Sequence, residues 1–143
     1  MPAARARIAL KRVYEEPTDA DGIRVLIDRL WPRGLTKDQA DVDAWLPDLA
    51  PSNELRKWFH AHSQQRGEFR KRYLGELKAD SAAKACQQLQ ELLNRRARVT
   101  LVFASKNAEY NNATVLREFI RGKSLRRKKP RTARPRSVRG SRK

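Results

Sequence analysis

Apolar and polar positions along this chain follow two periods, one typical of strands and one of helices. Residues 8–14 alternate apolar and basic side chains, which indicates a strand with one exposed face. Two short apolar runs, at 24–28 and 99–104, have the pattern of central strands covered on both faces. The stretch 42–49 fits a strand at period two and a helix at periods three and four. Its periodicity leaves both interpretations open.

Helical spacing of apolar residues separates these runs. Several of the amphipathic stretches begin at a good capping residue such as Thr36, Ser52 or Ser81. The helices we expect cover 37–41, 52–59, 64–77, 81–94 and 113–120. Strands that alternate with amphipathic helices predict a parallel sheet with helices on both faces, which is a small three-layer α/β fold.

The positive charge of the chain is concentrated at its C-terminal end. Of 143 residues, 33 are Lys or Arg and 16 are Asp or Glu, for a net charge of +17. Residues 121–143 hold much of this excess, contain no acid and have almost no apolar side chains. Such a segment cannot bury enough surface to offset its ordering entropy. We therefore expect one α/β domain over 1–120 and a disordered tail over 121–143.

The composition of that tail suits binding to the phosphates of DNA or RNA, because clustered cations release counterions from nucleic acid. The basic residues that would carry this function are Arg126, Arg127, Lys128, Lys129, Arg131, Arg134 and Arg136. A solubility tail, or weak contact with any acidic surface, explains the same composition. Both readings stay open at this point.

A polar cluster, DRLWPRG at 28–34, directly follows one apolar run, and the polar stretch 105–112 follows another. The carboxyl ends of parallel strands share one edge of a sheet, where ligands bind, so these two loops would meet if their strands are neighbours. Guanidinium and ammonium groups there suit phosphate or carboxylate. The sequence predicts a site for a small anionic, phosphate- or nucleotide-like ligand, lined by Arg29, Trp31, Arg33, Ser105, Lys106 and Asn111.

Asp28 is the candidate catalytic residue, because a carboxylate at this position can act as a general base or hold an arginine in place. A scaffold role is the alternative: Asp28 would pair with an arginine, Trp31 would fill the core, and 32–34 would form a turn. Serine and asparagine are also ordinary residues at helix starts. The sequence leaves open whether the protein is an enzyme.

Other features of the chain point away from metal, cofactor and membrane. The single cysteine, Cys86, excludes an internal disulfide and a cysteine-based metal cluster. His60 and His62 would point apart on a helix, which favours exposed helix-end histidines over a metal pair. No apolar run suits a signal peptide or a membrane span, so we expect a cytoplasmic protein without membrane contact, cofactor or metal. The oligomeric state is not predicted.

Five segments together resemble the bacterial YeaO-like proteins, a family of unknown function. These are KRVYEEP, DGIRVLIDRLWPRGLTK, DAWLPDLAPSNELRKWF, FRKRYLGEL and VTLVFASKNAEYNNATVLREF, within residues 8–120. The resemblance implies a compact α/β domain and favours a strand at 42–46, which makes four parallel strands. It supplies no catalytic residue. It adds Ser52 to the candidate ligand-binding residues, because Ser52 lies within a shared segment.

The chain departs from the family pattern at two places. Asn107 and Tyr110 stand where we expect an acid and often a histidine, which weakens any acid–base role for that loop. The sequence HAHSQQR at 60–66 replaces a more usual turn that contains His-Asp-Pro. The basic tail lies outside the resemblance.

Overall fold

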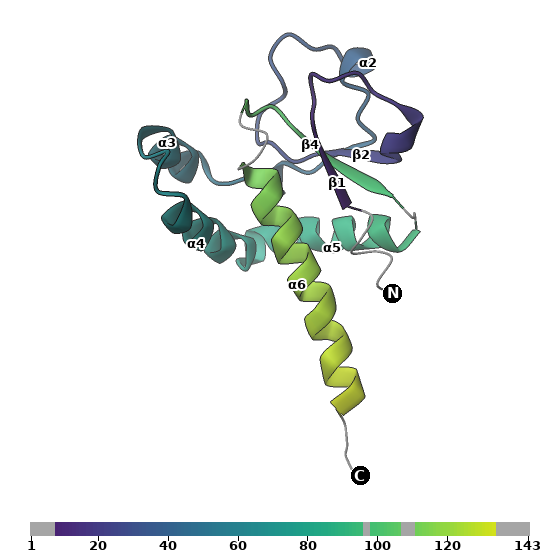
Figure 1. Ribbon diagram of the computed structural model, residues 1–143, viewed down its shortest axis with the longest axis vertical. Helices are drawn as coiled ribbons and strands as arrows, with labels where there is room; N and C mark the ends of the chain where they lie inside the picture. The colour runs from purple at the N-terminus through teal and green to yellow at the C-terminus, as the bar shows by residue number, and fades with distance from the viewer. Residues whose placement is uncertain (1–7, 96–97, 107–110, 134–143) are drawn as a thin grey trace.

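The computed structural model describes residues 8–95, 98–106 and 111–133, and describes side chains as far as Gly122. Its centre is a four-stranded parallel sheet in the order β1-β4-β2-β3 (Figure 1). The strands are β1 (Ile8–Arg12), β2 (Ile23–Leu26), β3 (Ala44–Trp45) and β4 (Val99–Phe103). The four parallel strands expected from the sequence are confirmed.

The strand pairing explains why the two loops of interest meet. β4 pairs with β1 from Ile8 opposite Val99 to Arg12 opposite Phe103, and with β2 on its other side. β2 and β4 are therefore neighbours, as the site hypothesis required. β3 pairs with β2 over two residues only, so the strand interpretation of the ambiguous stretch 42–49 holds for Ala44–Trp45, and a 3-10 helix follows.

The helical elements follow the sequence expectations closely, with two single-turn additions. Their bounds are η1 (Asp19–Asp21), α2 (Lys37–Ala40), η2 (Pro47–Leu49), α3 (Asn53–Ala61), α4 (Arg66–Leu77), α5 (Asp80–Arg95) and α6 (Asn112–Ala133). Thr36 and Gln39 form a capping box at the start of α2. The Ser52 hydroxyl accepts a hydrogen bond from the Leu55 amide and caps α3, as expected.

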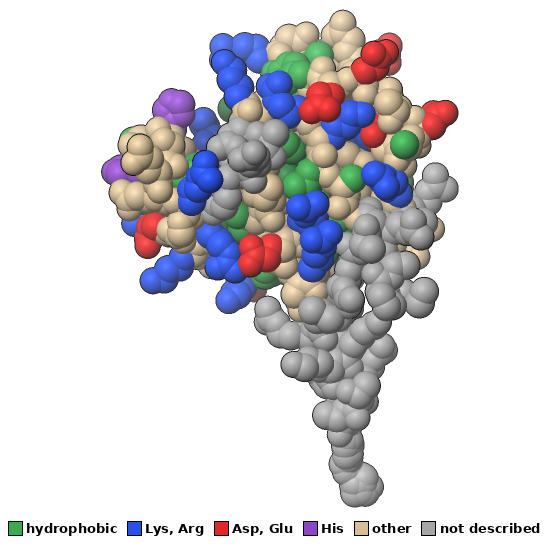
Figure 2. Space-filling view, in the orientation of Figure 1, with side chains coloured by type: hydrophobic (Ala, Val, Ile, Leu, Met, Phe, Trp, Pro, Cys, Tyr) green, Lys and Arg blue, Asp and Glu red, His purple; other side chains and the backbone are tan. Residues whose placement is uncertain are grey.

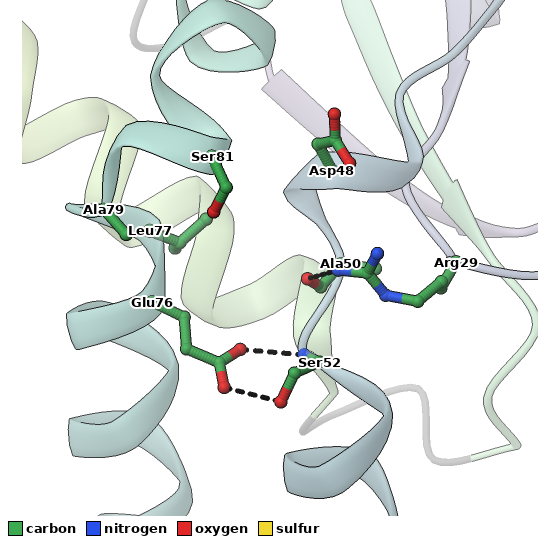
Figure 3. A pocket seen from close by; sticks show the side chains of 8 residues that line it. All are labelled: Arg29, Asp48, Ala50, Ser52, Glu76, Leu77, Ala79 and Ser81. Atoms are coloured by element: carbon green, nitrogen blue, oxygen red, sulfur yellow. Dashed lines mark hydrogen bonds between the residues drawn. The ribbon is translucent and has the colours of Figure 1, made fainter.

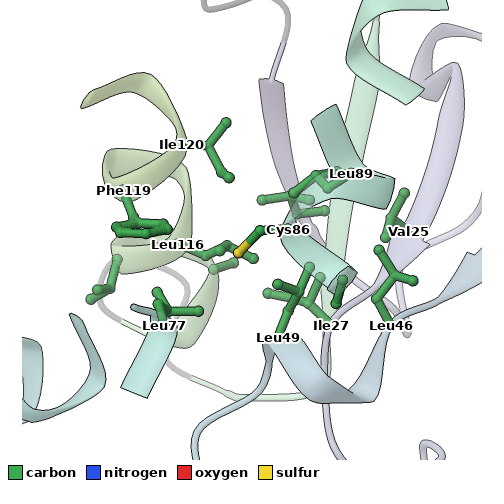
Figure 4. Packing of buried hydrophobic residues seen from close by; sticks show 14 of the residues in the cluster. Val25, Ile27, Leu46, Leu49, Leu77, Cys86, Leu89, Leu116, Phe119 and Ile120 are labelled. Atoms are coloured by element: carbon green, nitrogen blue, oxygen red, sulfur yellow. The ribbon is translucent and has the colours of Figure 1, made fainter. Parts of the chain in front are cut away.

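The larger core lies between one face of the sheet and helices α3 to α6. Alternate residues of β4 point to this face, so Val99, Leu101 and Phe103 are buried among helix side chains. Figure 4 shows Cys86 and Leu89 of α5 and Leu116 of α6 within this cluster. Cys86 is fully buried there, as a small apolar side chain would be.

The opposite face of the sheet is covered by the loop that contains α2, on the side away from α5 (Figure 1). Its core is small, and consists of Val13, Leu26, Ala40 and Val102 with partly buried neighbours such as Trp31. Both faces are thus covered, but this second layer contains one short helix and mostly loop. In the described part of the chain, no helix is both apolar enough and long enough to span a bilayer.

A buried arginine holds that second layer to the sheet. Arg24 is 2% exposed and donates to the carboxylate of Asp21 and to the carbonyl oxygens of Ala40 and Asp41. Lys11 also pairs with Asp21 at 3.1 Å. Burial opposes the ionisation of Asp21, but hydrogen bonds from Thr18, Lys11 and Arg24 outweigh it and hold the pKa of Asp21 at about 2.

Helix α6 is longer than the sequence predicted. Its first part packs on the sheet through Val115, Leu116 and Ile120, but the helix continues beyond Ile120 to Ala133 and leaves the body of the protein (Figure 1). The predicted end near Ile120 was wrong, because adding residues to an established helix costs little and Lys and Arg are good helix formers. Residues 134–143 lie outside the described residues, and disorder in the tail stays a prediction.

Candidate functional site

The two predicted loops meet at Asp28, directly after β2. One carboxylate oxygen of Asp28 accepts a hydrogen bond from the Ala104 amide at 2.7 Å, at the end of β4. The other accepts from the side-chain amide of Asn112 at 3.0 Å, at the start of α6. Asn112 also donates to the carbonyl of Ile27. Asp28 therefore joins β2, β4 and α6 in one hydrogen-bonded contact.

The electrostatics of this contact favour a neutral Asp28 more than usual. Burial raises the pKa of the carboxyl, and the hydrogen bonds from Asn112 and Ala104 offset part of that rise. Chemically, Asp28 has the raised pKa of a proton-transfer group, but both of its oxygens are occupied by protein donors. The geometry favours a structural role over that of a base that faces a substrate. The partners are the Ala104 amide and Asn112, however, and not the arginine that the scaffold alternative expected.

Arg29 leads from this contact to a hollow in the surface. Its guanidinium donates to the carbonyl oxygens of Ala50 and Pro51 at 3.1 and 3.2 Å. Beside it lies a hollow of about 200 Å³ (Figure 3). The residues that line this hollow are Arg29, Asp48, Ala50, Ser52, Glu76, Leu77, Ala79 and Ser81.

Glu76, which the sequence analysis missed, organises one side of the hollow. Its carboxylate accepts from the Ser52 amide at 2.8 Å and from the Ser52 hydroxyl at 2.6 Å (Figure 3). Glu76 lies on α4 next to the buried stripe that contains Leu77, and only this position could have pointed to it. With Asp48, the lining holds two carboxylates and one guanidinium, so its net charge does not favour an anion.

The remaining predicted residues of the first loop lie away from this hollow. The indole N–H of Trp31 donates to the Leu35 carbonyl, and its ring packs edge-on against Trp45 with centroids 5.5 Å apart. Arg33 is exposed, and its carbonyl accepts a hydrogen bond from the Tyr14 hydroxyl. These residues are brought beside one another and not beside Ser52.

The predicted residues of the second loop are likewise separated. Ser105 and Lys106 are exposed, and the Ser105 carbonyl accepts from Arg12. Asn111 is buried, and its side-chain oxygen accepts from the amides of Ala113 and Thr114 at the start of α6. Asn111 thus acts as a helix cap. Asn107 and Tyr110 lie outside the described residues.

The histidines are placed as expected at the end of α3. His60 is exposed, and the His62 ring stacks on Trp58 with centroids 4.7 Å apart. Among the described residues, no cluster of three His, Cys, Asp or Glu side chains could hold a metal ion. The candidate site is therefore a hydrogen-bonded contact at Asp28, an Arg29 hollow and an exposed aromatic surface next to them.

The sequence profile of the inactive DUF488-N3 subclade matches residues 7–138. The chain belongs to this family. It is similar to the uncharacterized protein YeaO of Escherichia coli, with 38% identity over 114 residues, which cover 80% of this chain and 96% of the relative. It is also similar to an uncharacterized protein of Mycobacterium tuberculosis, with 43% identity over 117 residues, or 82% of this chain and 96% of the relative.

The YeaO-like resemblance of the DRLWPRG and neighbouring segments is thus confirmed for this DUF488-N3 protein. No solved structure matches the chain. Both relatives are described as uncharacterized, so membership of the family assigns no role to any residue. The roles must come from the geometry above.

Proposed function

We propose that this DUF488-N3 protein binds nucleic acid through α6 and the basic segment that follows, without catalysing a reaction. The observation that carries the proposal is the continuity of α6. One helix begins at the Asp28 contact, packs on the sheet and continues into the most basic stretch of the chain (Figure 1). Clustered Lys and Arg residues release counterions from nucleic acid, and a segment that is already helical loses less backbone entropy on binding than a flexible tail does.

The length and charge of the extended helix suit a polyanion. Residues 121–133 span roughly 20 Å at 1.5 Å per residue. That is several phosphate spacings along one strand of nucleic acid. The Lys and Arg residues on this part of the helix are Arg121, Lys123, Arg126, Arg127, Lys128, Lys129 and Arg131.

Positive charge is already crowded where α6 leaves the body. Arg117 and Arg121 lie one turn apart, and burial together with the charge of Arg121 lowers the pKa of Arg117. Figure 2 shows further Lys and Arg side chains over α4 and α6. Phosphates bound along this surface would relieve repulsion between neighbouring guanidinium groups.

Two observations support a role without catalysis. The family is described as inactive. Asp28, the candidate base, is engaged on both oxygens by Ala104 and Asn112. Under this proposal Asp28 is a structural carboxylate that fixes the start of α6.

The test compares two variants of the full chain with equal changes in charge. The first replaces Arg126, Arg127, Lys128 and Lys129 by Gln, and the control replaces four exposed lysines of the body by Gln: Lys37, Lys57, Lys78 and Lys84. We expect the first variant to bind DNA and RNA more weakly and to lose about one unit of salt dependence for each phosphate contact removed. Equal losses of affinity in both variants would show that binding depends only on total charge, and would contradict the proposal.

A small anionic ligand at the Arg29 hollow is the second candidate. The guanidinium of Arg29 and the hydroxyl of Ser81 both line the hollow and favour an anion, whereas Asp48 and Glu76 oppose it. Thermal unfolding with and without inorganic phosphate tests this candidate. An increase in Tm that is lost in Arg29→Met and retained in Arg33→Met would support it, and no increase in the wild type would remove it.

A further inference from the structure

We propose that the DRLWPRG loop forms the base of a second surface, which stacks the unpaired bases of single-stranded nucleic acid. We call this surface the aromatic rim and define it by Tyr14, Leu30, Trp31 and Trp45. The inference rests on the proposed function in one respect, that nucleic acid is the ligand. It goes beyond that function because it names a different surface and a specific class of nucleic acid.

The rim gathers the exposed apolar side chains of the described chain. The large hydrophobic residues exposed there are Tyr14 at 41%, Leu30 at 63% and Trp45 at 41%. All three adjoin the same loop. Leu30 belongs to it, Trp45 donates to the Asp28 carbonyl at 2.7 Å, and Tyr14 donates to the Arg33 carbonyl at 2.9 Å. Exposed apolar side chains that border one loop of a highly charged protein indicate an interaction site.

The polar atoms of these rings are already used within the protein. The indole N–H of Trp45 bonds to Asp28, and that of Trp31 bonds to Leu35 at 2.7 Å. The two indoles also pack edge-to-face at 70°. The exposed part of these side chains is therefore ring surface in a fixed orientation. A flat partner can stack on it with little loss of side-chain entropy.

Cations and acids both lie beside the rim, since Glu15 follows Tyr14 and Asp43 precedes Trp45 by two residues. The cations are the groups that could meet phosphates. The Arg12 guanidinium lies 5.2 Å from the centroid of the Tyr14 ring and is held by the carbonyls of Ala104 and Ser105. Arg33 and Lys106 are exposed in the two adjoining loops. Rings that stack bases next to cations that meet phosphates are the features of single-strand binding surfaces. A second copy of this chain is disfavoured because each copy carries +17.

The strand order gives the rim its length. Tyr14 follows β1 and Trp45 lies in β3, at opposite edges of the sheet β1-β4-β2-β3. Three strand spacings correspond to roughly 14 Å, which is long enough for a few unpaired nucleotides. At the end of the molecule away from the tip of α6, Figure 2 shows hydrophobic side chains among Lys, Arg, Asp and Glu.

The experiment measures binding of the full chain to oligothymidylate of roughly ten nucleotides and to a DNA duplex of equal length. Trp45→Ala and Tyr14→Ala should each weaken single-strand binding about tenfold and leave duplex binding unchanged. The matched controls Trp45→Phe and Tyr14→Phe lose the hydrogen bond of the ring but keep a ring for stacking, so each should bind single strands more tightly than the alanine variant at the same position. Single-strand binding should also quench the tryptophan fluorescence of the wild type more than that of Trp45→Phe.

Each other outcome is equally clear. Single-strand binding unchanged in both alanine variants overturns the proposal, and so does an equal loss on duplex. Loss of a dimer in sedimentation by the alanine variants, with single-strand affinity unchanged, would assign the rim to a second copy instead. Neutralising residues 126–129 should weaken the binding of both probes. If this variant binds more weakly while the rim variants bind like the wild type, the rim proposal fails and the proposed function stands. Thermal unfolding of each variant confirms that it is folded.

Discussion

The side chain of Asn112 bridges Asp28 and the carbonyl of Ile27, at 3.0 and 3.2 Å, and so ties the first residue of α6 to the end of β2. Both acceptors directly follow β2, and the side chain of Asp28 is half-buried. A buried acceptor that loses its donor costs more free energy than the hydrogen bond contributes on balance. The position of α6 thus depends on one amide side chain.

We therefore expect Asn112→Ala to lower the free energy of unfolding by about 1–3 kcal/mol. Chemical denaturation of the variant and the wild type measures this difference. Asn94→Ala is the matched control, because Asn94 is an exposed residue of α5 and should change stability by less than about 0.5 kcal/mol. Equal stability of Asn112→Ala and the wild type would show that the bridge is not needed.

The stability of the protein should also depend on the ionisation of Asp28. Burial raises the pKa of Asp28 above its usual 3.8, so the folded state binds this proton more tightly than the unfolded state does. Stability is then reduced as pH rises from 3.8 through the folded pKa. The free energy of unfolding of Asp28→Asn should lack this decrease. A carboxyl carbon of Asp28 that titrates at or below 3.8 in NMR would contradict the expectation.

Asp21 should show the opposite pH dependence. Its pKa is about 2 in the folded protein, so its contribution to stability is complete above the usual 3.8 and is lost as pH falls toward 2. Asp21→Asn leaves the buried Arg24 without its carboxylate. We expect a loss of about 3–5 kcal/mol at neutral pH, and a smaller difference from the wild type in acid. Denaturation curves at a series of pH values test both parts.

How far the sequence determined these features depends on the range of the interactions. The apolar run at 99–104 predicted β4 correctly, and Ser52 and Thr36 predicted two helix starts, because such signals are local. The pairing of Glu76 with Ser52 joins residues 24 apart. Such long-range contacts leave no local pattern. The family resemblance therefore added Ser52 to the candidate ligand-binding residues, but nothing in the sequence could show that its hydroxyl donates to Glu76.

Gly22 provides a test of the turn before β2. Its φ is +68°, and a Cβ built there would lie 2.5 Å from the Arg98 carbonyl oxygen. We expect Gly22→Ala to destabilise the fold by at least about 2 kcal/mol. The control is Gly75→Ala in α4, where a Cβ meets open space. This substitution should stabilise the helix by about 0.5–1 kcal/mol. Thermal unfolding distinguishes the two, and similar Tm changes would contradict this account of the turn.

The brevity of β3 affects how the molecule behaves in concentrated solution. A strand of two residues at one border of the sheet offers a neighbouring molecule very few unpaired backbone groups. Trp45 occupies one of those two positions with its ring packed against Trp31. The short strand therefore disfavours polymerisation by strand addition at this border, although an aromatic surface lies exposed beside it.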